Sequence, residues 1–424
     1  MRVAVIGAGI VGVASAYELA ADGHEVSVYE RHAGVASEGS FAHAGIVAPG
    51  YATPWDAPGM PLQAWRQLCG AHAPVRLGGA GALGQLPWLW RRWRAARAGT
   101  SPSHRAALVA LARFSKQRLH ELTDLLELQY EQARGVLVLL RGERELAWAR
   151  PALDRLAESR FEFELLDAAQ CHRLEPGLNT ATPLHAGISL PRDGVGNGRH
   201  FAQLLRVHAQ HRGAHFRFGH EVHSLSADTS PRLISTDLAS GAAAEARFDA
   251  VLLCTSHASN RLLAPLRRAL PLAPVYGHSI TAPLQLGEHA ATLGPRAAVM
   301  DEKFKVTITR LGQRIRVAGS TEIGGPAQRI HPSRLATLHK VLDDWFPGAA
   351  RRAQTSVWKG ARPMLPDGLP LLGAIGSSGI WLNLGHGSSG FALACGSARV
   401  IADLMAGHEP AIDVGGLQPR RVLV

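Results

Sequence analysis

The N-terminal segment of this chain constrains its fold more strongly than any other stretch of the sequence. It reads "VAVIGAGIVG", in which the apolar run at residues 3–6 is typical of a buried parallel strand. Gly7, Gly9 and Gly12 follow with the spacing G-x-G-x-x-G, and a helical pattern then continues to residue 21. In such a unit the first glycine permits a tight turn, the second admits a pyrophosphate, and the third lets the helix pack closely on the strand. The helix N-terminus adds unpaired N–H groups that favour an anion.

A second apolar strand at residues 25–29 ends on an acidic residue, Glu30. A carboxylate at this place accepts hydrogen bonds from a ribose diol and disfavours a ribose 2′-phosphate. The order of strand, glycine loop, helix, strand and terminal acid is much more specific than the glycine spacing alone. It predicts a Rossmann-type dinucleotide-binding unit and leaves NAD and FAD open as its ligand.

Length and patterning predict two domains. A chain of 424 residues exceeds the size of a typical single domain. Helical patterns dominate residues 61–174, whereas residues 271–318 alternate as strands do, with a hairpin turn at residues 311–313. We therefore predict an α/β fold in which a discontinuous nucleotide domain is interrupted by an α+β substrate domain with a mixed or antiparallel sheet. The expected boundaries are 1–55, 187–265 and 350–424 for the nucleotide domain, and 56–186 and 266–349 for the substrate domain.

The chain carries a formal net charge of +11, which favours anionic partners. Because the basic residues are scattered, we expect no nucleic acid partner. The cysteines are far apart and form no C-x-x-C pair, which argues against a disulfide framework and fits a reducing, cytoplasmic compartment. Histidines gather at residues 208–223 across a helix-to-strand boundary, so we expect a solvated basic face there and no metal site. The four cysteines are Cys69, Cys171, Cys254 and Cys395.

One segment, "LPWLWRRWRAARAG" at residues 86–99, interleaves tryptophan with arginine. This composition is typical of a helix that lies in a membrane interface. The alternative, which we favour, is a domain helix that buries its tryptophans on one side and exposes its arginines. The N-terminal run at residues 2–21 is largely apolar, but its three glycines and Tyr17-Glu18 argue against a membrane anchor, and no other stretch reaches the ~20 uninterrupted apolar residues that a membrane span requires. We expect a soluble or peripheral protein, with contact to the inner face of the cytoplasmic membrane left open.

A second glycine-rich loop, "GHGSSGFALACG", lies near the other end of the chain at residues 385–396. It leads into a helical pattern from Gly390 to Met405, and Ser388 and Ser389 are suited to cap that helix. FAD is long enough to need two such loops, one for its diphosphate and one for its isoalloxazine ring, whereas a nicotinamide cofactor is not. The positive end of the helix dipole would stabilise the negative charge of a reduced flavin. We therefore predict FAD as the cofactor.

Five stretches together resemble a known family, the FAD-dependent oxidoreductases related to D-amino acid oxidase, and most of all its bacterial D-amino acid dehydrogenases (small subunit). They extend from one end of the chain to the other and read "VAVIGAGIVGVASAYELAADGHEV", "AGIVAPGYATPWDAPGMPL", "ITRLGQRIRVAG", "GARPMLPDGLPLLG" and "GHGSSGFALACGSARVIADLMAG". The resemblance implies that a Rossmann-type domain binds FAD and that a D-amino acid is oxidised to an imino acid, which water converts to a 2-oxo acid and ammonia. It also implies hydride transfer from the substrate α-carbon to flavin N5, with electrons passed to a quinone or another acceptor that is not oxygen.

The resemblance further implies a set of site residues. Arg362 matches the family's carboxylate-binding arginine, which agrees with the bidentate geometry of a guanidinium on a carboxylate. The strand that lines the substrate site aligns with Tyr276, Gly277 and His278. We therefore expect Tyr276 and His278 to act beside Arg362, with a tyrosine hydroxyl supplied by Tyr276 or absent. The residues expected to bind the cofactor are Gly7, Gly9, Ile10, Val11, Gly12, Glu30, Arg31, His43, Ala44, Gly45, Val222, Gly385, His386, Gly387, Ser388, Ser389 and Gly390.

Alternatives from other functional classes remain at this stage. A flavoprotein that only senses redox state would have no need of Arg362, and an NAD-dependent dehydrogenase would not need the second glycine loop. Within the enzyme class, the alternative is a dehydrogenase or oxidase of a narrower substrate, such as D-hydroxyproline or another cyclic or secondary amino acid.

Overall fold

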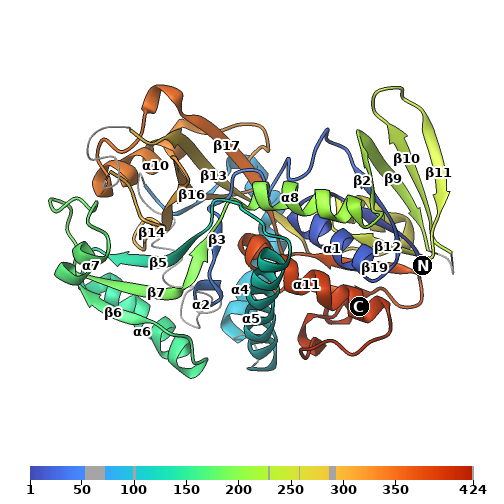
Figure 1. Ribbon diagram of the computed structural model, residues 1–424, viewed down its shortest axis with the longest axis horizontal. Helices are drawn as coiled ribbons and strands as arrows, with labels where there is room; N and C mark the ends of the chain where they lie inside the picture. The colour runs from blue at the N-terminus through green and yellow to red at the C-terminus, as the bar shows by residue number, and fades with distance from the viewer. Residues whose placement is uncertain (53–71, 99–101, 228–229, 257, 286–292, 423–424) are drawn as a thin grey trace.

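The computed structural model describes the chain except residues 53–71, 99–101, 228–229, 257, 286–292 and 423–424. The predicted boundary between residues 55 and 56, and Cys69, therefore lie outside the described residues. Figure 1 shows two lobes, each built on its own large sheet, with both chain termini in the lobe that contains β1.

The first lobe contains a six-stranded sheet in the order β18-β19-β12-β1-β2-β8. Neighbouring strands run parallel except for β18, which is antiparallel to β19. The predicted strand that ends at Glu30 and the predicted helix α1 (Ile10–Ala21) are confirmed, as is the Rossmann-type order of these elements. The strands are β1 (Arg2–Ile6), β2 (Glu25–Glu30), β8 (His215–Phe218), β12 (Ala250–Leu253), β18 (Leu371–Ala374) and β19 (Ile380–Leu384).

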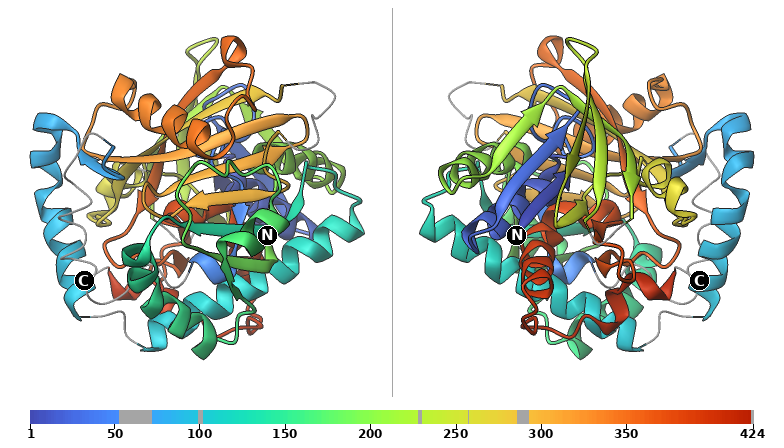
Figure 2. Two further views of the ribbon diagram at one scale, coloured as in Figure 1. Left: turned by 90° about the vertical axis from the view of Figure 1, so that its left-hand side faces the viewer. Right: turned by 90° about the vertical axis from the view of Figure 1, so that its right-hand side faces the viewer.

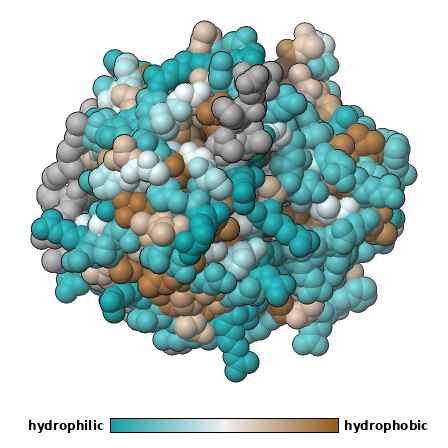
Figure 3. Space-filling view, turned by 60° about the vertical axis from the view of Figure 1, so that its left-hand side comes forward, coloured by the Kyte–Doolittle hydropathy of each residue, from teal (hydrophilic) through white to brown (hydrophobic). Residues whose placement is uncertain are grey.

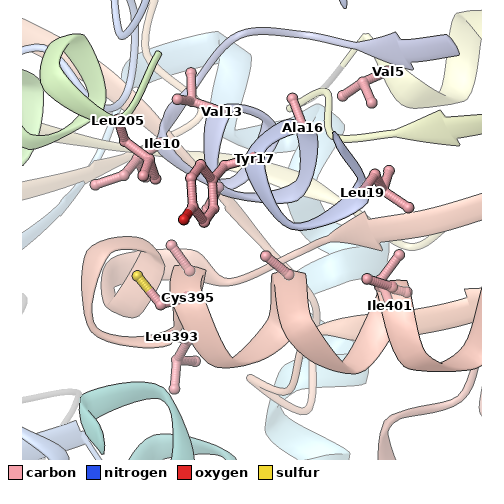
Figure 4. Close-up of a cluster of buried hydrophobic side chains, with 14 of the residues drawn as sticks. Val5, Ile10, Val13, Ala16, Tyr17, Leu19, Leu205, Leu393, Cys395 and Ile401 are labelled. Atoms are coloured by element: carbon pink, nitrogen blue, oxygen red, sulfur yellow. The ribbon is translucent and has the colours of Figure 1, made fainter. Parts of the chain in front are cut away.

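The two faces of this sheet have different covers. Val3 and Val5 of β1 pack against a layer of helices that includes α1, α8 (Gly198–His211) and α11 (Gly390–Met405). Figure 4 shows Tyr17 of α1 pointing toward α11 within this layer, and Ile10 beside Leu205 of α8. The opposite face packs against a three-stranded sheet, of which the strands are β9 (His220–Ser226), β10 (Arg232–Asp237) and β11 (Ala243–Arg247).

The long helix α5 (Pro102–Leu125) also belongs to this helical layer, because it packs along α11. The sequence boundaries had assigned it to the substrate domain. Arg118 of α5 donates to the buried carboxylate of Glu18 at 2.7 Å, and Arg399 of α11 donates to the same carboxylate at 3.0 Å. Glu18 therefore ties together three helices from distant parts of the chain.

The second lobe is built on a mixed, mostly antiparallel sheet of ten strands, as predicted for the substrate domain. Its order is β17-β13-β16-β15-β14-β5-β7-β3, with β4 beside β16 and β6 beside β7. The strands are β3 (Ile46–Val47), β4 (Val75–Leu77), β5 (Ala133–Leu140), β6 (Glu164–Asp167), β7 (Ala186–Val195), β13 (Ala273–Pro283), β14 (Ala298–Asp301), β15 (Val306–Leu311), β16 (Arg314–Ile323) and β17 (Ser356–Met364). The remaining α-helices are α2 (Pro49–Ala52), α4 (Leu86–Ala98), α6 (Glu143–Glu158), α7 (Ala168–Leu174), α9 (Ser259–Leu263) and α10 (Pro332–Trp345).

Two strands of this sheet come from segments that the predicted boundaries gave to the nucleotide domain. β7 pairs with β5 and β17 pairs with β13, so residues 187–195 and 356–364 belong to the ten-stranded sheet. The predicted hairpin is confirmed, because β15 and β16 pair up to Leu311 and Arg314 on either side of a tight turn.

The β17–β13–β16 end of this sheet has two distinct faces. On what we call the α10 face, Ile280 packs with Val317 beneath α10, which lies over this lobe in Figure 1. On the opposite face, which we call the cavity face, side chains point toward the first lobe. Because cross-strand partners share a face, Ser279 of β13 lies on the cavity face with Ala318 of β16 and Trp358 of β17.

Candidate cofactor and substrate site

A cavity that opens to solvent lies between the two lobes, and its empty space, counted together with the solvent at its mouth, is about 1500 Å³. One side is lined by the glycine loop after β1 and by the ends of β2 and β12. The other side is lined by Ala318, Trp358 and Arg362 of the cavity face and by the loop that precedes α11. The two glycine loops, nearly a chain length apart in sequence, therefore border one space.

The first glycine loop shapes the nucleotide end of this cavity. A Cβ atom on Gly12 would lie 1.9 Å from the carbonyl oxygen of Gly7, so only glycine allows α1 to pack this closely on the turn. Gly9 faces more open space, with Ser40 Oγ at 3.6 Å from an added Cβ atom. Four residues predicted to bind the cofactor line the cavity, namely Gly7, Gly9, Ile10 and Val11. Gly12 does not line it and contributes only by allowing the close packing of α1 on the turn.

Glu30 lies at the carboxyl end of β2, where it lines the cavity. Its Oε2 atom accepts a hydrogen bond from the backbone N–H of Ala8 at 2.8 Å, and Oε1 accepts from His32 at 2.9 Å. These bonds hold the carboxylate in one orientation at the place expected for ribose binding. Two further predicted residues, Arg31 and Val222, also line this end.

Arg31 is held by an ion pair with Glu38, which also contacts the ring of His32 at 2.8 Å. Burial alone would raise the pKa of Glu38, but hydrogen bonds from His32 and Arg31 hold that pKa below its ordinary value. The carboxylate is therefore ionised at neutral pH, and it fixes Arg31 at the edge of the cavity.

The loop at residues 42–44 is fastened to the cavity face by three consecutive carbonyl groups. Ser279 Oγ donates to the oxygen of Ala42 at 2.7 Å, and Thr309 Oγ1 donates to Ala44 at 2.9 Å. Between them, Arg316 Nη1 donates to the oxygen of His43 at 3.1 Å. Three strands of the second lobe therefore set the position of this loop, and two of its predicted residues, His43 and Ala44, line the cavity.

His43 is neutral in this setting. Burial, with the nearby guanidinium groups of Arg316 and Arg362, lowers the pKa of His43 to about 3. Its Nδ1 atom accepts a hydrogen bond from the backbone N–H of Gly45 at 3.0 Å, so the ring proton resides on Nε2. Gly45 itself does not line the cavity. It has a φ of 79° and an added Cβ atom would lie 2.4 Å from the oxygen of Gly196, so glycine is required there.

The second glycine loop closes the other end of the cavity, where Gly385, His386, Gly387, Ser388 and Gly390 line it. His386 is buried, and burial lowers its pKa to about 3. Its Nε2 atom lies 3.0 Å from Ser397 Oγ of α11. The predicted helix bounds are confirmed, since α11 spans Gly390–Met405. The residue before it, Ser389, makes no side-chain capping bond and lies outside the cavity lining, which differs from the predicted role.

Arg362 lines the same cavity from β17. Its Nη1 atom lies 3.5 Å from Thr321 Oγ1, and no carboxylate lies within ion-pair distance of it in the described part of the chain. Burial lowers the pKa of this guanidinium, which nevertheless stays protonated because arginine starts from so high a value. A partly buried cation without an anionic partner has a desolvation cost, and here Arg362 lines a cavity that an anion can enter.

Tyr276 and His278, which we expect to act on the substrate, have their side chains on the α10 face of the sheet. Tyr276 is opposite Glu322 in the β13–β16 pair, and His278 is opposite Lys359 in the β13–β17 pair, so all four side chains lie on the α10 face. The ring of His278 bonds the carbonyl oxygen of Ser320 at 2.8 Å and is fully buried, although the residue borders the cavity wall. The ring of Tyr276 lies under the ammonium group of Lys359, with 4.5 Å from the nitrogen to the ring centroid. Because side chains alternate along a strand, it is Gly277 that faces Arg362.

Several lining residues were not predicted from the sequence. Ser40 accepts a hydrogen bond from the first N–H of α1, that of Ile10, at 3.2 Å. Among the described residues, Ser256 Oγ and Asn383 Oδ1 have no hydrogen-bond partner although they are buried and line the cavity. Ser256 follows the parallel strand β12, and Asn383 lies near the carboxyl end of the parallel strand β19. Ligands of open α/β sheets bind at the carboxyl ends of such strands, so this position in the sequence could have identified both residues. Unpaired polar atoms, the orienting Glu30 and two glycine loops fit a long, polar dinucleotide.

The comparison with known proteins decides the family. Residues 2–404 match the family described as FAD dependent oxidoreductase, or DAO. The chain belongs to this family. FAD is therefore its cofactor, and the residues that would hold FAD are those of the cavity described above.

Similar proteins cover the full extent of the chain. A D-amino acid dehydrogenase from Rhizorhabdus wittichii is 41% identical over 419 residues, which are 98% of this chain and 99% of that protein. A D-amino acid dehydrogenase from Cereibacter sphaeroides is 39% identical and covers 98% of this chain and 94% of that protein. Among solved structures, glycine oxidase from Geobacillus kaustophilus has a TM-score of 0.74 at 21% identity, over 98% of this chain and 97% of that one, and so shares the fold of this family.

Proposed function

We propose that the protein is a D-amino acid dehydrogenase, which oxidises a D-amino acid to its imino acid. The observation that carries this proposal is Arg362, a partly buried guanidinium with no acidic partner among the described residues, in the cavity bordered by both glycine loops. A guanidinium so placed binds the carboxylate of an amino acid through two parallel hydrogen bonds. The similarity to two D-amino acid dehydrogenases over nearly the full chain supports the same substrate class.

The chemistry divides between cofactor and protein. Bound FAD supplies the oxidising group, which accepts a hydride from the substrate α-carbon at N5. The protein fixes the substrate carboxylate at Arg362 and so determines which substituent of the α-carbon points into the cavity. Neutral His43 and His386 add no positive charge that would repel the substrate amino group. The substrate also loses one proton from nitrogen, and water then converts the imino acid to a 2-oxo acid and ammonia.

A substrate panel with purified, FAD-loaded protein tests this function. We expect reduction of an artificial electron acceptor with D-amino acids, none with their L-enantiomers, and little oxygen consumption. Turnover only with D-hydroxyproline or another cyclic or secondary amino acid would favour the narrower alternative. Rapid hydrogen peroxide formation with D-alanine would contradict transfer to a quinone or another acceptor that is not oxygen.

The role of Arg362 is tested in the same assay. Arg362→Ala removes the carboxylate contact, and we expect kcat/KM to fall roughly 100-fold, which is about 3 kcal/mol. Arg362→Lys keeps the charge but loses the bidentate geometry, so its kcat/KM should lie between those of Arg362→Ala and the unchanged protein. Both variants should retain the flavin absorbance. Unchanged kcat/KM in Arg362→Ala would show that another group binds the carboxylate.

We further propose that the protein contacts the membrane through α4, where a lipid-soluble quinone would be available as electron acceptor. Trp88 of α4 is buried and donates to the carbonyl oxygen of Met364 at 3.1 Å, just beyond Arg362 in β17. The outer side of α4 exposes Trp90 and Trp93, which are 54% and 45% accessible. The segment that contains α4 forms the outer edge of the molecule in both views of Figure 2, in light blue. The helix thus combines both patterns considered for the sequence, with one buried and two exposed tryptophans.

The charges beside these tryptophans favour an anionic surface. Arg94 lies over the ring of Trp90 at 4.7 Å and Arg97 over that of Trp93 at 4.8 Å, each measured to the ring centroid. Arginine and tryptophan on one helix face suit the headgroup layer of a membrane that contains acidic lipids. In the chain segments that the structure describes, no helix is long and apolar enough to cross a bilayer. Figure 3 shows another face of the molecule, which is mostly hydrophilic with scattered hydrophobic patches.

Vesicle sedimentation tests the membrane contact. We expect binding to vesicles that contain an acidic phospholipid, weaker binding to neutral vesicles, and at least a tenfold loss of affinity when Trp90 and Trp93 are both changed to Ala. The matched control is Trp148→Leu, because Trp148 is also exposed but lies on α6, which packs against β5 and β7 and not against the strands beneath α4. Equal binding of all three proteins would contradict the role of α4.

A further inference from the structure

The cavity face contains a patch without side chains, formed by two glycines. Gly277 of β13 pairs directly with Gly360 of β17, so both glycines lie side by side on the same face of the sheet. Neither glycine has a backbone conformation that excludes other residues, since no positive φ is found at either position. The reason for glycine must therefore be the space above the two residues.

That space is occupied by two different side chains. A Cβ atom added to Gly277 would lie 2.4 Å from Arg362 Nη2 and 2.8 Å from its Cζ, so the guanidinium lies directly over Gly277. A Cβ atom added to Gly360 would lie 1.9 Å from Cζ2 and 2.2 Å from Cη2 of Trp358, so the indole ring lies directly over Gly360. The guanidinium and the indole thus occupy neighbouring positions on one glycine floor, and both line the cavity.

The distribution of acidic side chains around the cavity determines which substrate side chains are favoured beside Arg362 and Trp358. Among the described lining residues the acidic side chains are Glu30, Glu38 and Glu221, which belong to the nucleotide end, in or just after β2 and in β9. A cationic substrate side chain therefore meets no carboxylate near Arg362 in this part of the structure. The indole of Trp358 presents a flat, apolar surface to the cavity beside Arg362.

We propose that Trp358 is a specificity-determining residue, which packs against the substrate side chain and selects D-amino acids with large apolar, above all aromatic, side chains. Gly360 is a positioning residue in this arrangement, because it lets the indole lie flat against the sheet. Gly277 has the same role toward Arg362. The proposal rests on the proposed oxidation of D-amino acids and names the class of side chain that the site accepts.

The test compares D-phenylalanine with D-alanine as substrates of the FAD-loaded protein. In Trp358→Leu we expect the ratio of kcat/KM for D-phenylalanine to that for D-alanine to fall at least tenfold. Trp358→Phe retains an aromatic surface and should restore most of the ratio. The matched control, Trp148→Leu, changes an exposed tryptophan of α6 and should leave the ratio unchanged.

Two glycine substitutions separate the roles of the two side chains. Gly360→Ala displaces the indole and should lower the ratio as Trp358→Leu does. Gly277→Ala displaces the guanidinium and should raise KM for both substrates by similar factors, without changing the ratio.

A ratio that stays within twofold in both Trp358→Leu and Gly360→Ala overturns the role of Trp358. The proposed function fails separately, if the unchanged protein oxidises no D-amino acid at all. Spectral titration of the bound flavin with phenylacetate and acetate gives a readout that does not depend on turnover. Trp358→Leu should weaken the binding of phenylacetate at least tenfold and that of acetate less than twofold, and equal effects on the two ligands would also overturn the proposal.

Discussion

Both faces of the β17–β13–β16 sheet carry charged side chains, but the charges differ in whether a carboxylate lies within ion-pair distance. On the α10 face, the side chain of Lys359 is 2% exposed. Its ammonium group lies 3.0 Å from Glu322 and also donates to the carbonyl oxygens of Pro326 and Arg329. On the cavity face, Arg362 and Arg316 have no carboxylate within ion-pair distance among the described residues. Arg316 is also buried, and burial, with neighbouring Arg314, lowers its pKa to about 10.

This difference shows which buried charges support the fold and which await a ligand. A buried ion pair is neutral overall, whereas a lone buried guanidinium carries an uncompensated desolvation cost. On the cavity face, a substrate carboxylate or the negative charge of a reduced cofactor can offset this desolvation cost. Removing a charge should therefore destabilise the α10 face and leave the cavity face nearly as stable as before.

The largest expected effect contrasts Lys359→Met with Arg362→Met. Lys359→Met leaves Glu322 buried without its partner, so we expect the free energy of unfolding to fall by about 3–5 kcal/mol. Arg362→Met removes a partly buried charge that has no carboxylate partner among the described residues, so the change should be within about 1 kcal/mol or in the stabilising direction. Urea titration followed by circular dichroism measures both. Equal losses of stability in the two variants would contradict the comparison.

A smaller effect concerns the pH dependence of stability through His278 on the α10 face. Burial lowers the pKa of His278 to about 4, so between this value and its ordinary value of 6.5 the unfolded chain binds a proton that the folded chain does not. This contribution to stability is present above about pH 6.5 and is lost as the pH falls toward 4, by roughly 3 kcal/mol in total.

In His278→Gln we therefore expect a shallower slope of unfolding free energy against pH between 4 and 6.5. The slope should not disappear, because His43 and His386 have pKa values lowered to about 3 and act in the same direction. An unchanged slope in urea titrations at several pH values would show that His278 does not titrate in this range.

The smallest expected effect is the difference in FAD affinity between two variants, each of which removes one buried serine hydroxyl from a different face of the sheet. Ser279→Ala removes the hydrogen bond to Ala42 on the cavity face and loosens the loop at residues 42–44. We expect FAD to bind about fivefold more weakly, which corresponds to about 1 kcal/mol for one hydrogen bond. Ser320→Ala removes the bond to the carbonyl oxygen of Arg334 on α10 and should lower the unfolding temperature without changing FAD affinity. Flavin fluorescence during dilution measures the affinity, and equal affinities in both variants would weaken the comparison.

Much of the nucleotide end could be predicted from the sequence, because its determinants are local. The glycine spacing, α1 and Glu30 lie within one continuous segment, and each has a physical role that depends on its neighbours in sequence. The second glycine loop was also found for a local reason, since residues 385–389 immediately precede α11, which begins at Gly390.

The substrate end could not be predicted in the same way, because its determinants are cross-strand. β13 is buried on both faces, so its sequence does not show which of Tyr276, Gly277 and His278 faces the cavity. The pairing of Gly277 with Gly360 depends on the register of two strands far apart in the chain. The position of α5 was missed for a related reason, since its partner α11 is almost 300 residues away.

The assembly of the six-stranded sheet has a consequence for how the protein is made. β1 can pair with β2 soon after both leave the ribosome. The other neighbour of β1 is β12, and the helix that packs on α1 is α11, and both are synthesised much later. Until then β1 has an unpaired edge and α1 an uncovered apolar side, which are features that promote aggregation of a nascent chain. The carboxylate of Glu18 likewise gains Arg399 only at the end of synthesis. The cofactor site is therefore completed in one late step, and chains that stop before α11 should be targets for proteolysis with no capacity to retain FAD.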